Sequence, residues 1–135
     1  MSRADLIVIG AGAGGLSVAA GAAQMGARVV LIEAGEMGGD CLNHGCVPSK
    51  ALIAAAEAAQ SMREAGRFGL AAVEPEVDFV AVMDHVAGVI AGIAPHDSQA
   101  RFEGLGVRVI RGRARFAGTD AVEVNGEVLR GRRIV

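Results

Sequence analysis

The sequence predicts an α/β domain built around a parallel β-sheet, and three observations lead to this prediction. Two short apolar runs, residues 6–9 and 29–32, are typical of strands buried on both faces. A segment with helical spacing lies between them, which makes a strand–helix–strand unit. The 135 residues are 52% hydrophobic and 3% aromatic and include 20 glycines, a composition that suits one compact α/β domain and argues against a sandwich, a disordered tail or a collagen-like rod.

The first helix is predicted between these two strands. Its apolar residues recur at the spacing of one helix face: Leu16, Ala19, Ala20 and Ala23. Gly26 can end this helix in a left-handed conformation. The strand that follows ends at Glu33.

Two longer helices are predicted in the middle of the chain. Residues 50–65 are alanine-rich and end at Gly66. Asp78 is a plausible N-cap for the next helix, whose apolar residues keep helical spacing: Phe79, Val82, Met83, Val86, Ile90 and Ile93. Pro95 should kink or interrupt this helix, which is expected to resume before Gly104.

The last part of the chain predicts strands. Residues 107–110 form one, and residues 122–128 form a hairpin around Asn125-Gly126, a pair typical of a type I′ turn. Residues 132–135 predict the beginning of a further strand. Arginines alternate with apolar residues over 108–115, which favours a solvated sheet face over an anion site.

Charge and hydropathy exclude several classes of protein. A net charge of −2 gives no sign of binding to nucleic acid or to an anionic membrane surface. No cleavage-type stretch follows the first apolar run, and no window approaches the ~18 apolar residues that a bilayer span needs. We therefore expect a cytoplasmic protein that binds neither nucleic acid nor membrane. In that compartment two cysteines at short spacing are expected to be catalytic, redox-sensing or metal-binding.

A glycine-rich loop joins the first strand to the first helix and reads Gly10-Ala11-Gly12-Ala13-Gly14-Gly15. The G-x-G-x-x-G pattern in it is weak by itself, because a glycine-rich chain produces it by chance, and a loop without a ligand is the alternative. Its setting strengthens the pattern: the loop follows a strand and opens a helix, and Glu33 stands at the acidic position about 20 residues further on.

The loop residues suit a dinucleotide. Gly10 is expected to make the tight turn, Gly12 to let a pyrophosphate approach the backbone, and Gly15 to let helix and strand pack closely. The helix N terminus offers N–H groups to the phosphates. Glu33 can accept hydrogen bonds from ribose hydroxyls and would repel a 2′-phosphate. The motif predicts the adenylate half of a dinucleotide without deciding between NAD and FAD.

The two cysteines, Cys41 and Cys46, lie five residues apart. On a regular helix such residues are ~7.5 Å apart along the axis, whereas a disulfide needs Cα atoms within ~7 Å. The pair can bridge only if the backbone departs from a regular helix, which Gly45 permits. We infer that Cys41 lies in a distorted stretch before the long helix and Cys46 near its start, where the helix end and Lys50 would favour a thiolate.

A metal site is the alternative for this segment, with Cys41, His44, Cys46 and Asp40 as ligands. The spacing is not a usual zinc spacing, and the fourth ligand would have to be Asp or water. We therefore expect no metal. The other two histidines, His85 and His96, are most simply surface or packing residues.

Residues 38–50 read Gly-Gly-Asp-Cys-Leu-Asn-His-Gly-Cys-Val-Pro-Ser-Lys. This segment resembles the signature G-G-x-C-x-N-x-G-C-x-P-[S/K]-K of the class I pyridine nucleotide–disulfide oxidoreductases, which include dihydrolipoyl dehydrogenases, mercuric reductases and glutathione reductases. Every fixed position is met, and the Pro48-Ser49-Lys50 ending is more like the lipoyl and mercuric branches. The glycine loop and residues 112–116 resemble the same family, so the resemblance spans nearly the whole chain.

The resemblance implies a Rossmann-like FAD-binding domain with a parallel sheet, helices on both faces and a small antiparallel hairpin. It implies FAD as cofactor, with Cys41 and Cys46 as the redox disulfide beside the isoalloxazine. Cys46 would face the flavin, Cys41 would exchange with substrate, and Lys50 would lie near the flavin's reactive nitrogen. The other residues that it implies in cofactor binding are Gly10, Gly12, Ala13, Gly14, Gly15, Glu33, Ala34, Gly39, Asp40 and Ala114.

Asp40 stands where members of the family usually carry Thr. Its carboxylate should repel a diphosphate unless it points away or is protonated.

The resemblance also implies partners and domains beyond these residues. The complete enzyme would be a homodimer that uses NAD(P)H as co-substrate and acts on a small dithiol, disulfide or mercuric substrate. We expect residues 1–135 to be the N-terminal part of the FAD-binding domain, truncated before the nicotinamide and interface domains, with an open sheet edge prone to self-association. A non-catalytic dinucleotide-binding fragment without turnover of its own is the alternative.

Overall fold

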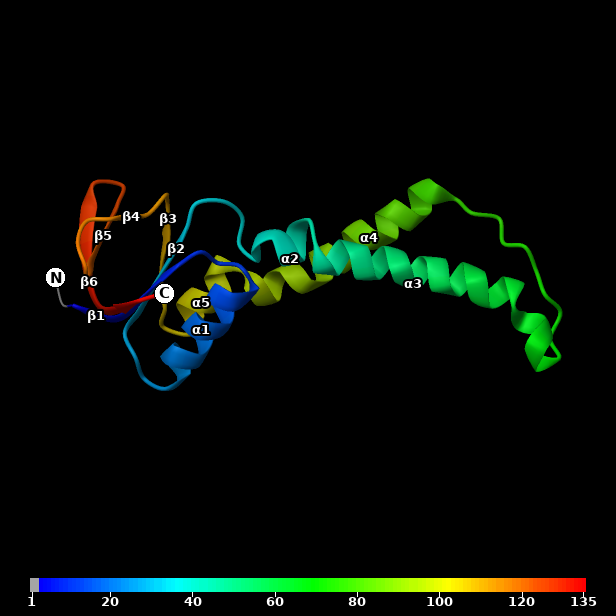
Figure 1. Ribbon diagram of the computed structural model, residues 1–135, viewed down its shortest axis with the longest axis horizontal. Helices are drawn as coiled ribbons and strands as arrows, with labels where there is room; N and C mark the ends of the chain where they lie inside the picture. Colours follow the sequence, from blue (N-terminus) through cyan, green and yellow to red (C-terminus); the bar gives the residue numbers. More distant parts are fainter. Residues whose placement is uncertain (1–2) are drawn as a thin grey trace.

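A computed structural model describes residues 3–135 as a body of sheet and helices from which two long helices extend as an arm (Figure 1). The strands are β1 (Ala4–Ile9), β2 (Val29–Glu33), β3 (Arg108–Arg111), β4 (Arg115–Phe116), β5 (Ala121–Val124) and β6 (Glu127–Ile134). The α-helices are α1 (Ala13–Gln24), α2 (Gly39–Asn43), α3 (Cys46–Arg63), α4 (Phe79–Ile93) and α5 (Gln99–Gly104). Short 3₁₀ helices, η1 and η2, cover Ala65–Phe68 and Ala94–Asp97. The predicted α/β class is confirmed.

The sheet has six strands in the order β3-β2-β1-β6-β5-β4. β1 and β2 pair in parallel, as do β2 with β3 and β1 with β6, whereas β4, β5 and β6 pair antiparallel. The turn at Asn125-Gly126 has two positive φ angles, 52° and 81°, as a type I′ turn requires. The hairpin prediction is therefore confirmed.

Residues 132–135 do not begin a separate strand, contrary to the prediction. Residues 132–134 continue β6, which pairs with β5 in its first half and with β1 in its second, and Val135 follows the end of the strand. Gly131 lies buried at the change of partner, where an added Cβ would be 3.0 Å from the Ile7 side chain. A glycine thus lets one strand serve both parts of the sheet. Among the described residues, Arg132–Ile134 is paired only on the β1 side.

Two cores lie on opposite faces of the sheet. One packs α1 and α5 against the parallel strands, with these buried residues: Val8, Ala11, Leu16, Ala19, Val29, Leu31, Phe102 and Val107. The other lies between the parallel strands and the antiparallel ones: Ala4, Ile7, Val30, Ile32, Val122, Val124 and Leu129. Helices were expected on both faces, but in the second core strands take their place, because the antiparallel part curls back over the sheet.

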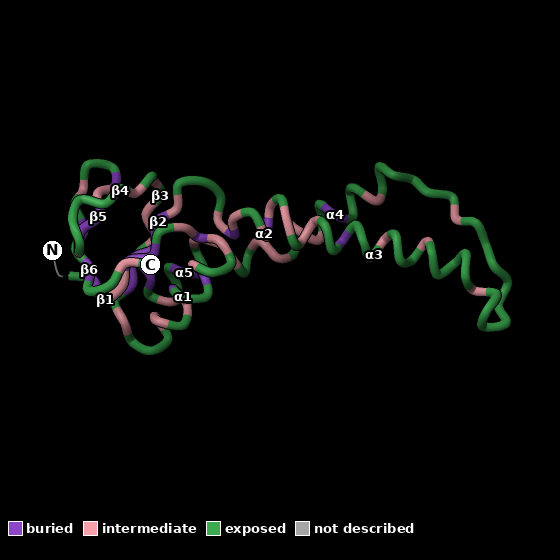
Figure 2. The backbone as a smooth tube through the Cα atoms, viewed as in Figure 1, coloured by how far each residue is buried: buried purple, intermediate pink, exposed green. Residues whose placement is uncertain are grey.

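The arm consists of α3 and α4, which pack antiparallel (Figure 1). Figure 2 shows that buried residues concentrate in the body, while the arm is largely exposed.

Both predicted boundaries of helix α4 are confirmed. The Asp78 side chain accepts a hydrogen bond from the Ala81 N–H at 3.1 Å, and the helix gives way to a 3₁₀ turn at Pro95 before α5.

The helical stretch Phe79–Gly104 is long and apolar enough to cross a membrane by length and composition, because an 18-residue window within it has a mean hydropathy of 1.4. By length and composition, the expectation that no window of the sequence is apolar enough for a bilayer span is therefore wrong. The stretch is not one continuous α-helix, since residues 94–97 divide it. α4 alone has 15 residues, which rise about 22 Å, less than the ~30 Å of a hydrocarbon core.

The approach of α1 to β1 generates a stability prediction. A Cβ at Gly15 would lie 1.9 Å from the Gly10 carbonyl oxygen and 3.2 Å from Val8 Cγ1. We expect Gly15→Ala to lower the free energy of unfolding by roughly 1–3 kcal/mol through overpacking. Gly21→Ala is the control on the same helix, because a Cβ there meets nothing within 4 Å, and it should stabilise by about 1 kcal/mol through helix propensity. Urea unfolding measures both, and equal effects would contradict this account.

Candidate functional site

The glycine loop lies at the carboxyl ends of β1 and β2, where open α/β sheets bind ligands. Gly10 turns the chain with φ +104°, and its N–H donates to the Ile32 carbonyl at 2.8 Å. Gly15 makes the close helix–strand contact described above. A Cβ at Gly12 would meet nothing within 4 Å, so the loop presents open space at the position assigned to the pyrophosphate. The expected turn and packing roles of Gly10 and Gly15 are confirmed.

The first turn of α1 presents N–H groups at this loop. The ladder of helix bonds begins with Leu16 N–H donating to the Gly12 carbonyl at 2.9 Å. The N–H groups of Ala13, Gly14 and Gly15 precede that bond, so the helix itself supplies no acceptor for them. Ala13 and Gly14 are also exposed. These groups and the helix dipole suit an anionic diphosphate.

Glu33 connects the loop to the turn that follows β2. Its carboxylate accepts hydrogen bonds from the Ala11 N–H and the Gly35 N–H, each at 2.5 Å. The sequence predicted a ribose contact for Glu33, and the two backbone contacts were missed. A carboxylate has about four lone-pair sites, so two remain for ribose hydroxyls.

Residues 112–114 leave β3 beside Glu33, because the Gly112 N–H donates to the Glu33 carbonyl at 2.9 Å. Ala114 is half-buried and packs against the second core. Ala34, directly after Glu33, is exposed. The structure thus brings Glu33, Ala34 and the 112–114 segment, all expected from the sequence to contact the cofactor, to one end of the sheet.

The cysteines lie on two different helices. Cys41 is in the five-residue α2 and Cys46 opens α3. Gly45 separates the two helices with φ −120° and ψ −106°, which are not helical values. The predicted departure from a regular helix is confirmed, although the distorted stretch contains a short helix that the sequence did not predict.

The cysteine segment packs directly on the glycine loop. The Gly38 N–H donates to the Ala11 carbonyl at 2.9 Å. A Cβ at Gly39 would lie 2.8 Å from the Gly12 Cα, so only glycine lets the two backbones come this close. Asn43 holds the start of the segment by donating to the Met37 and Gly39 carbonyls at 3.2 and 2.9 Å. That contact explains the asparagine of the signature.

The two thiols interact. Cys41 is half-buried, Cys46 is exposed, and both are free. The pKa of Cys41 is raised, first by its hydrogen bond to the Cys46 side chain, then by burial and by the charge of Cys46. The Cys46 backbone N–H and the Lys50 charge act in the opposite direction. Lys50, exposed on α3, is therefore close enough to affect the pair electrostatically, and Cys41 holds its proton to higher pH than a free cysteine.

Asp40 is exposed in the first turn of α2. Within residues 3–135, no three His, Cys, Asp or Glu side chains come together as a possible metal site. The structure does not assemble the alternative ligand set of Asp40, Cys41, His44 and Cys46.

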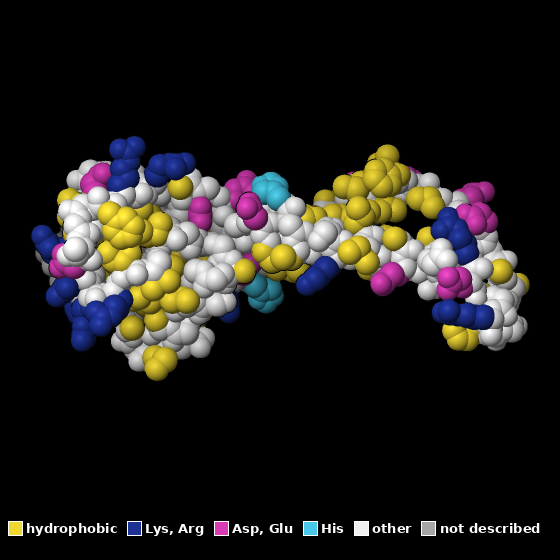
Figure 3. All heavy atoms as spheres, in the orientation of Figure 1, with side chains coloured by type: hydrophobic (Ala, Val, Ile, Leu, Met, Phe, Trp, Pro, Cys, Tyr) yellow, Lys and Arg dark blue, Asp and Glu magenta, His cyan; other side chains and the backbone are white. Residues whose placement is uncertain are grey.

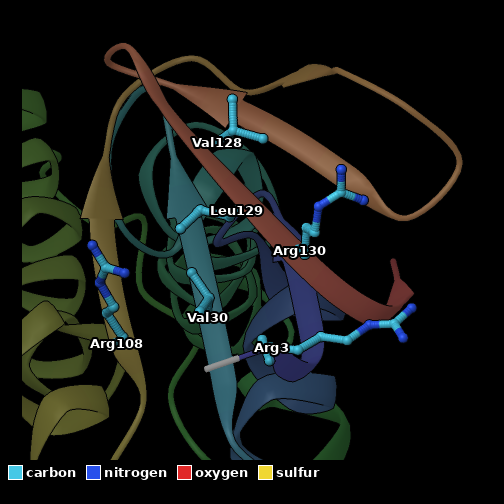
Figure 4. Close-up of a pocket in the computed structure, with 7 residues that line it drawn as sticks. Arg3, Val30, Arg108, Val128, Leu129 and Arg130 are labelled. Carbon is cyan, nitrogen blue, oxygen red and sulfur yellow. The ribbon is translucent and has the colours of Figure 1, made fainter. Parts of the chain in front are cut away.

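A cleft of about 410 Å³ lies at the opposite, amino end of the sheet (Figure 4). It is lined by Arg3, Ala4, Val30, Arg108, Val128, Leu129 and Arg130. Its arginines are engaged: Arg108 pairs with Glu127 at 2.8 Å, and Arg3 and Arg130 share Asp120 at 3.2 and 2.8 Å. The cleft is separate from the glycine loop, and its cations already have anionic partners.

Known proteins resemble this chain over nearly all its length. The sequence profile of the family described as pyridine nucleotide-disulphide oxidoreductase matches residues 4–135. Dihydrolipoyl dehydrogenase of Thermus scotoductus is 42% identical over 134 residues, which cover 94% of this chain and 27% of that protein. Mercuric reductase of Streptomyces lividans is 42% identical over 124 residues, which cover 89% of this chain and 26% of that protein.

A solved structure is also similar: the Cu(II) complex of the HOCl-induced flavoprotein disulfide reductase RclA from Escherichia coli. It has a TM-score of 0.71 and 27% identity over 96% of this chain and 26% of that chain. The chain thus spans about a quarter of the length of the relatives it matches. Because the family profile covers residues 4–135 and the fold agrees with that of a flavoprotein disulfide reductase, this chain belongs to the pyridine nucleotide-disulphide oxidoreductase family.

Proposed function

We propose that this chain binds FAD and carries the redox-active dithiol of an NAD(P)H-dependent disulfide oxidoreductase of the dihydrolipoyl dehydrogenase or mercuric reductase type. Residues 1–135 then form the N-terminal part of the FAD-binding domain. One observation carries the proposal: the Gly39–Gly12 contact packs α2, which carries Cys41 and is followed at once by Cys46, against a dinucleotide-type loop. Neither a structural cysteine pair nor an unliganded turn explains both features together.

The residues present fit the cofactor. The N–H groups of Ala13, Gly14 and Gly15 have no acceptor within the helix and follow directly on the open position Gly12, so they suit the diphosphate, and Glu33 suits the ribose. When bound, FAD would supply electron transfer between NAD(P)H and the protein disulfide. The negative charge of Asp40 opposes a diphosphate, and the exposure of this side chain allows the solvent to screen that repulsion.

Cys41 and Cys46 have different roles in the proposed thiol–disulfide exchange. Reduction of the Cys41–Cys46 disulfide takes up two electrons and two protons and yields two thiols. With a disulfide substrate, the Cys41 thiolate attacks one substrate sulfur, which releases a thiol and leaves a mixed disulfide. Cys46 then attacks the Cys41 sulfur, which releases the second thiol and restores the intramolecular disulfide. Lys50 stabilises the negative charge that develops on the pair.

The 135-residue chain by itself is proposed to bind the adenosine half without turnover, because it contains one G-x-G-x-x-G loop and the reaction uses two dinucleotides. The activity, the substrate, a homodimeric assembly and a cytoplasmic location are proposals for the whole protein.

Replacing Cys46 tests the proposed function in an enzyme of complete length. Residues 4–135 would replace the matching segment of the 42% identical Thermus scotoductus dihydrolipoyl dehydrogenase. Cys46→Ser is expected to abolish lipoamide-dependent NADH turnover, because the disulfide can no longer form, while the flavin absorbance stays. The unsubstituted chimera is the control. A chimera that purifies without flavin, or a Cys46→Ser variant that still turns over, contradicts the proposal.

The raised pKa of Cys41 gives a pH prediction. Because the Cys46 side chain is the main cause of the increase, Cys46→Ala should shift the alkylation of Cys41 by iodoacetamide to lower pH. Lys50→Gln should shift it to higher pH, since the Lys50 charge lowers this pKa. Peptide mass spectrometry of the rate against pH measures both. Identical Cys41 profiles in all three proteins would show that the thiols and Lys50 are not coupled.

Glu33→Ala is expected to weaken ADP binding to the 135-residue chain by roughly ten-fold or more, because hydrogen bonds to a charged group contribute about 1.5–3 kcal/mol. Glu36→Ala is the matched control in the same turn, since Glu36 is exposed and contacts Gly39 only through its backbone carbonyl. Isothermal titration measures both affinities. Equal affinity of Glu33→Ala and wild type would remove Glu33 from the ribose site.

A further inference from the structure

Arg111 lies directly across from Glu33 in the sheet, a position that the sequence did not single out. β2 and β3 are parallel, and their register pairs Glu33 with Arg111 at the carboxyl ends of both strands. An arginine therefore stands beside the carboxylate assigned to the ribose. Its side chain is exposed, and it reaches the turn after β2.

These two residues bind the backbone of Gly35 on both sides of its Cα. Its N–H donates to Glu33 Oε1 at 2.5 Å, and its carbonyl accepts a hydrogen bond from Arg111 Nη2. The turn at residues 34–36 has a partly exposed backbone that would otherwise sample many conformations. Two charged side chains from adjacent strand ends thus fix the two peptide groups that flank Gly35, and through them the direction of the Glu33 carboxylate.

The antiparallel hairpin in turn fixes Arg111. Asn125 Nδ2 donates to the Arg111 carbonyl at 2.9 Å. Gly112 permits this approach, because a Cβ there would lie 2.5 Å from Asn125 Oδ1 and 2.8 Å from Val124 Cγ2. A chain of contacts therefore leads from the hairpin turn through Arg111 and Gly35 to Glu33, and from Glu33 Oε2 to Ala11 in the glycine loop.

We propose that Arg111 is a positioning residue of the adenosine site, which holds the 34–36 turn through the Gly35 carbonyl so that Glu33 is preorganised for the ribose. This inference rests on the proposed binding of FAD. Arginine suits the role because its long side chain carries several donors in a rigid, planar group, whereas lysine offers a single rotatable ammonium.

The test compares two ligands on the 135-residue chain, ADP and inorganic pyrophosphate. Pyrophosphate needs only the glycine loop and the helix N terminus, whereas ADP also needs the adenosine site. Arg111→Met is expected to weaken ADP binding about five- to ten-fold, the effect of one lost hydrogen bond. Pyrophosphate binding should stay within about twofold of wild type. Arg111→Lys should recover part of the ADP affinity.

Arg108→Met is the matched control, because Arg108 lies on the same strand at the opposite end and pairs with Glu127. It should leave both affinities unchanged. Hydrogen exchange of the Gly35 amide gives an independent readout, and it should accelerate in Arg111→Met and not in Arg108→Met. If circular dichroism shows Arg111→Met to be unfolded, Asn125→Gly replaces it, since glycine keeps the left-handed turn and removes the contact to the Arg111 carbonyl.

The outcomes separate the two proposals. Equal ADP affinity in Arg111→Met and wild type overturns the role of Arg111 and leaves the proposed function standing. Loss of ADP and pyrophosphate binding by the same factor shows a general structural effect and also overturns it. A wild-type chain that binds pyrophosphate but not ADP overturns the adenosine site itself, and this inference with it.

Discussion

The contact between two glycine backbones, Gly12 in the loop after β1 and Gly39 at the start of α2, is the constraint on which the rest of the site depends. It brings the thiol-bearing helices against the loop that presents its N–H groups to a diphosphate. Any side chain at Gly39 would push the two segments apart and move the cysteines away from the loop. The hydrogen bond from the Gly38 N–H to the Ala11 carbonyl stabilises the same contact.

Several turns and hydrogen bonds at the carboxyl ends of the strands support this contact. Gly10 turns there, Glu33 joins two loops through its carboxylate, and Gly112 binds the Glu33 carbonyl. The antiparallel strands cover the face opposite α1 and supply Asn125, which holds the end of β3. These links are glycine turns, backbone hydrogen bonds and polar side chains that bind backbone groups.

The body and the arm differ in how they are stabilised. The body buries two apolar cores, whereas the arm of α3 and α4 exposes many large hydrophobic side chains, a group of which gathers over the first turns of α4 (Figure 3). Phe79 and Val80, for example, are 62% and 72% exposed. The thiols lie where the arm joins the body, so packing in the body determines their position.

The sequence by itself determined the element types around the site, the glycine loop, Glu33, both cysteines and the family signature, because these depend on local chemistry: apolar periodicity, positive φ angles, helix caps and cysteine spacing. Only the tertiary structure decided that β6 serves both parts of the sheet and that strands cover the second face. The same holds for α2, the double contact of Glu33 and the place of Arg111 beside it. Most of these features join distant residues: Ala11 and Glu33 lie 22 positions apart, Glu33 and Arg111 lie 78 apart, and Ala4 and Gly131 lie 127 apart. Strand order and register set such pairings, and no local pattern of residues encodes them.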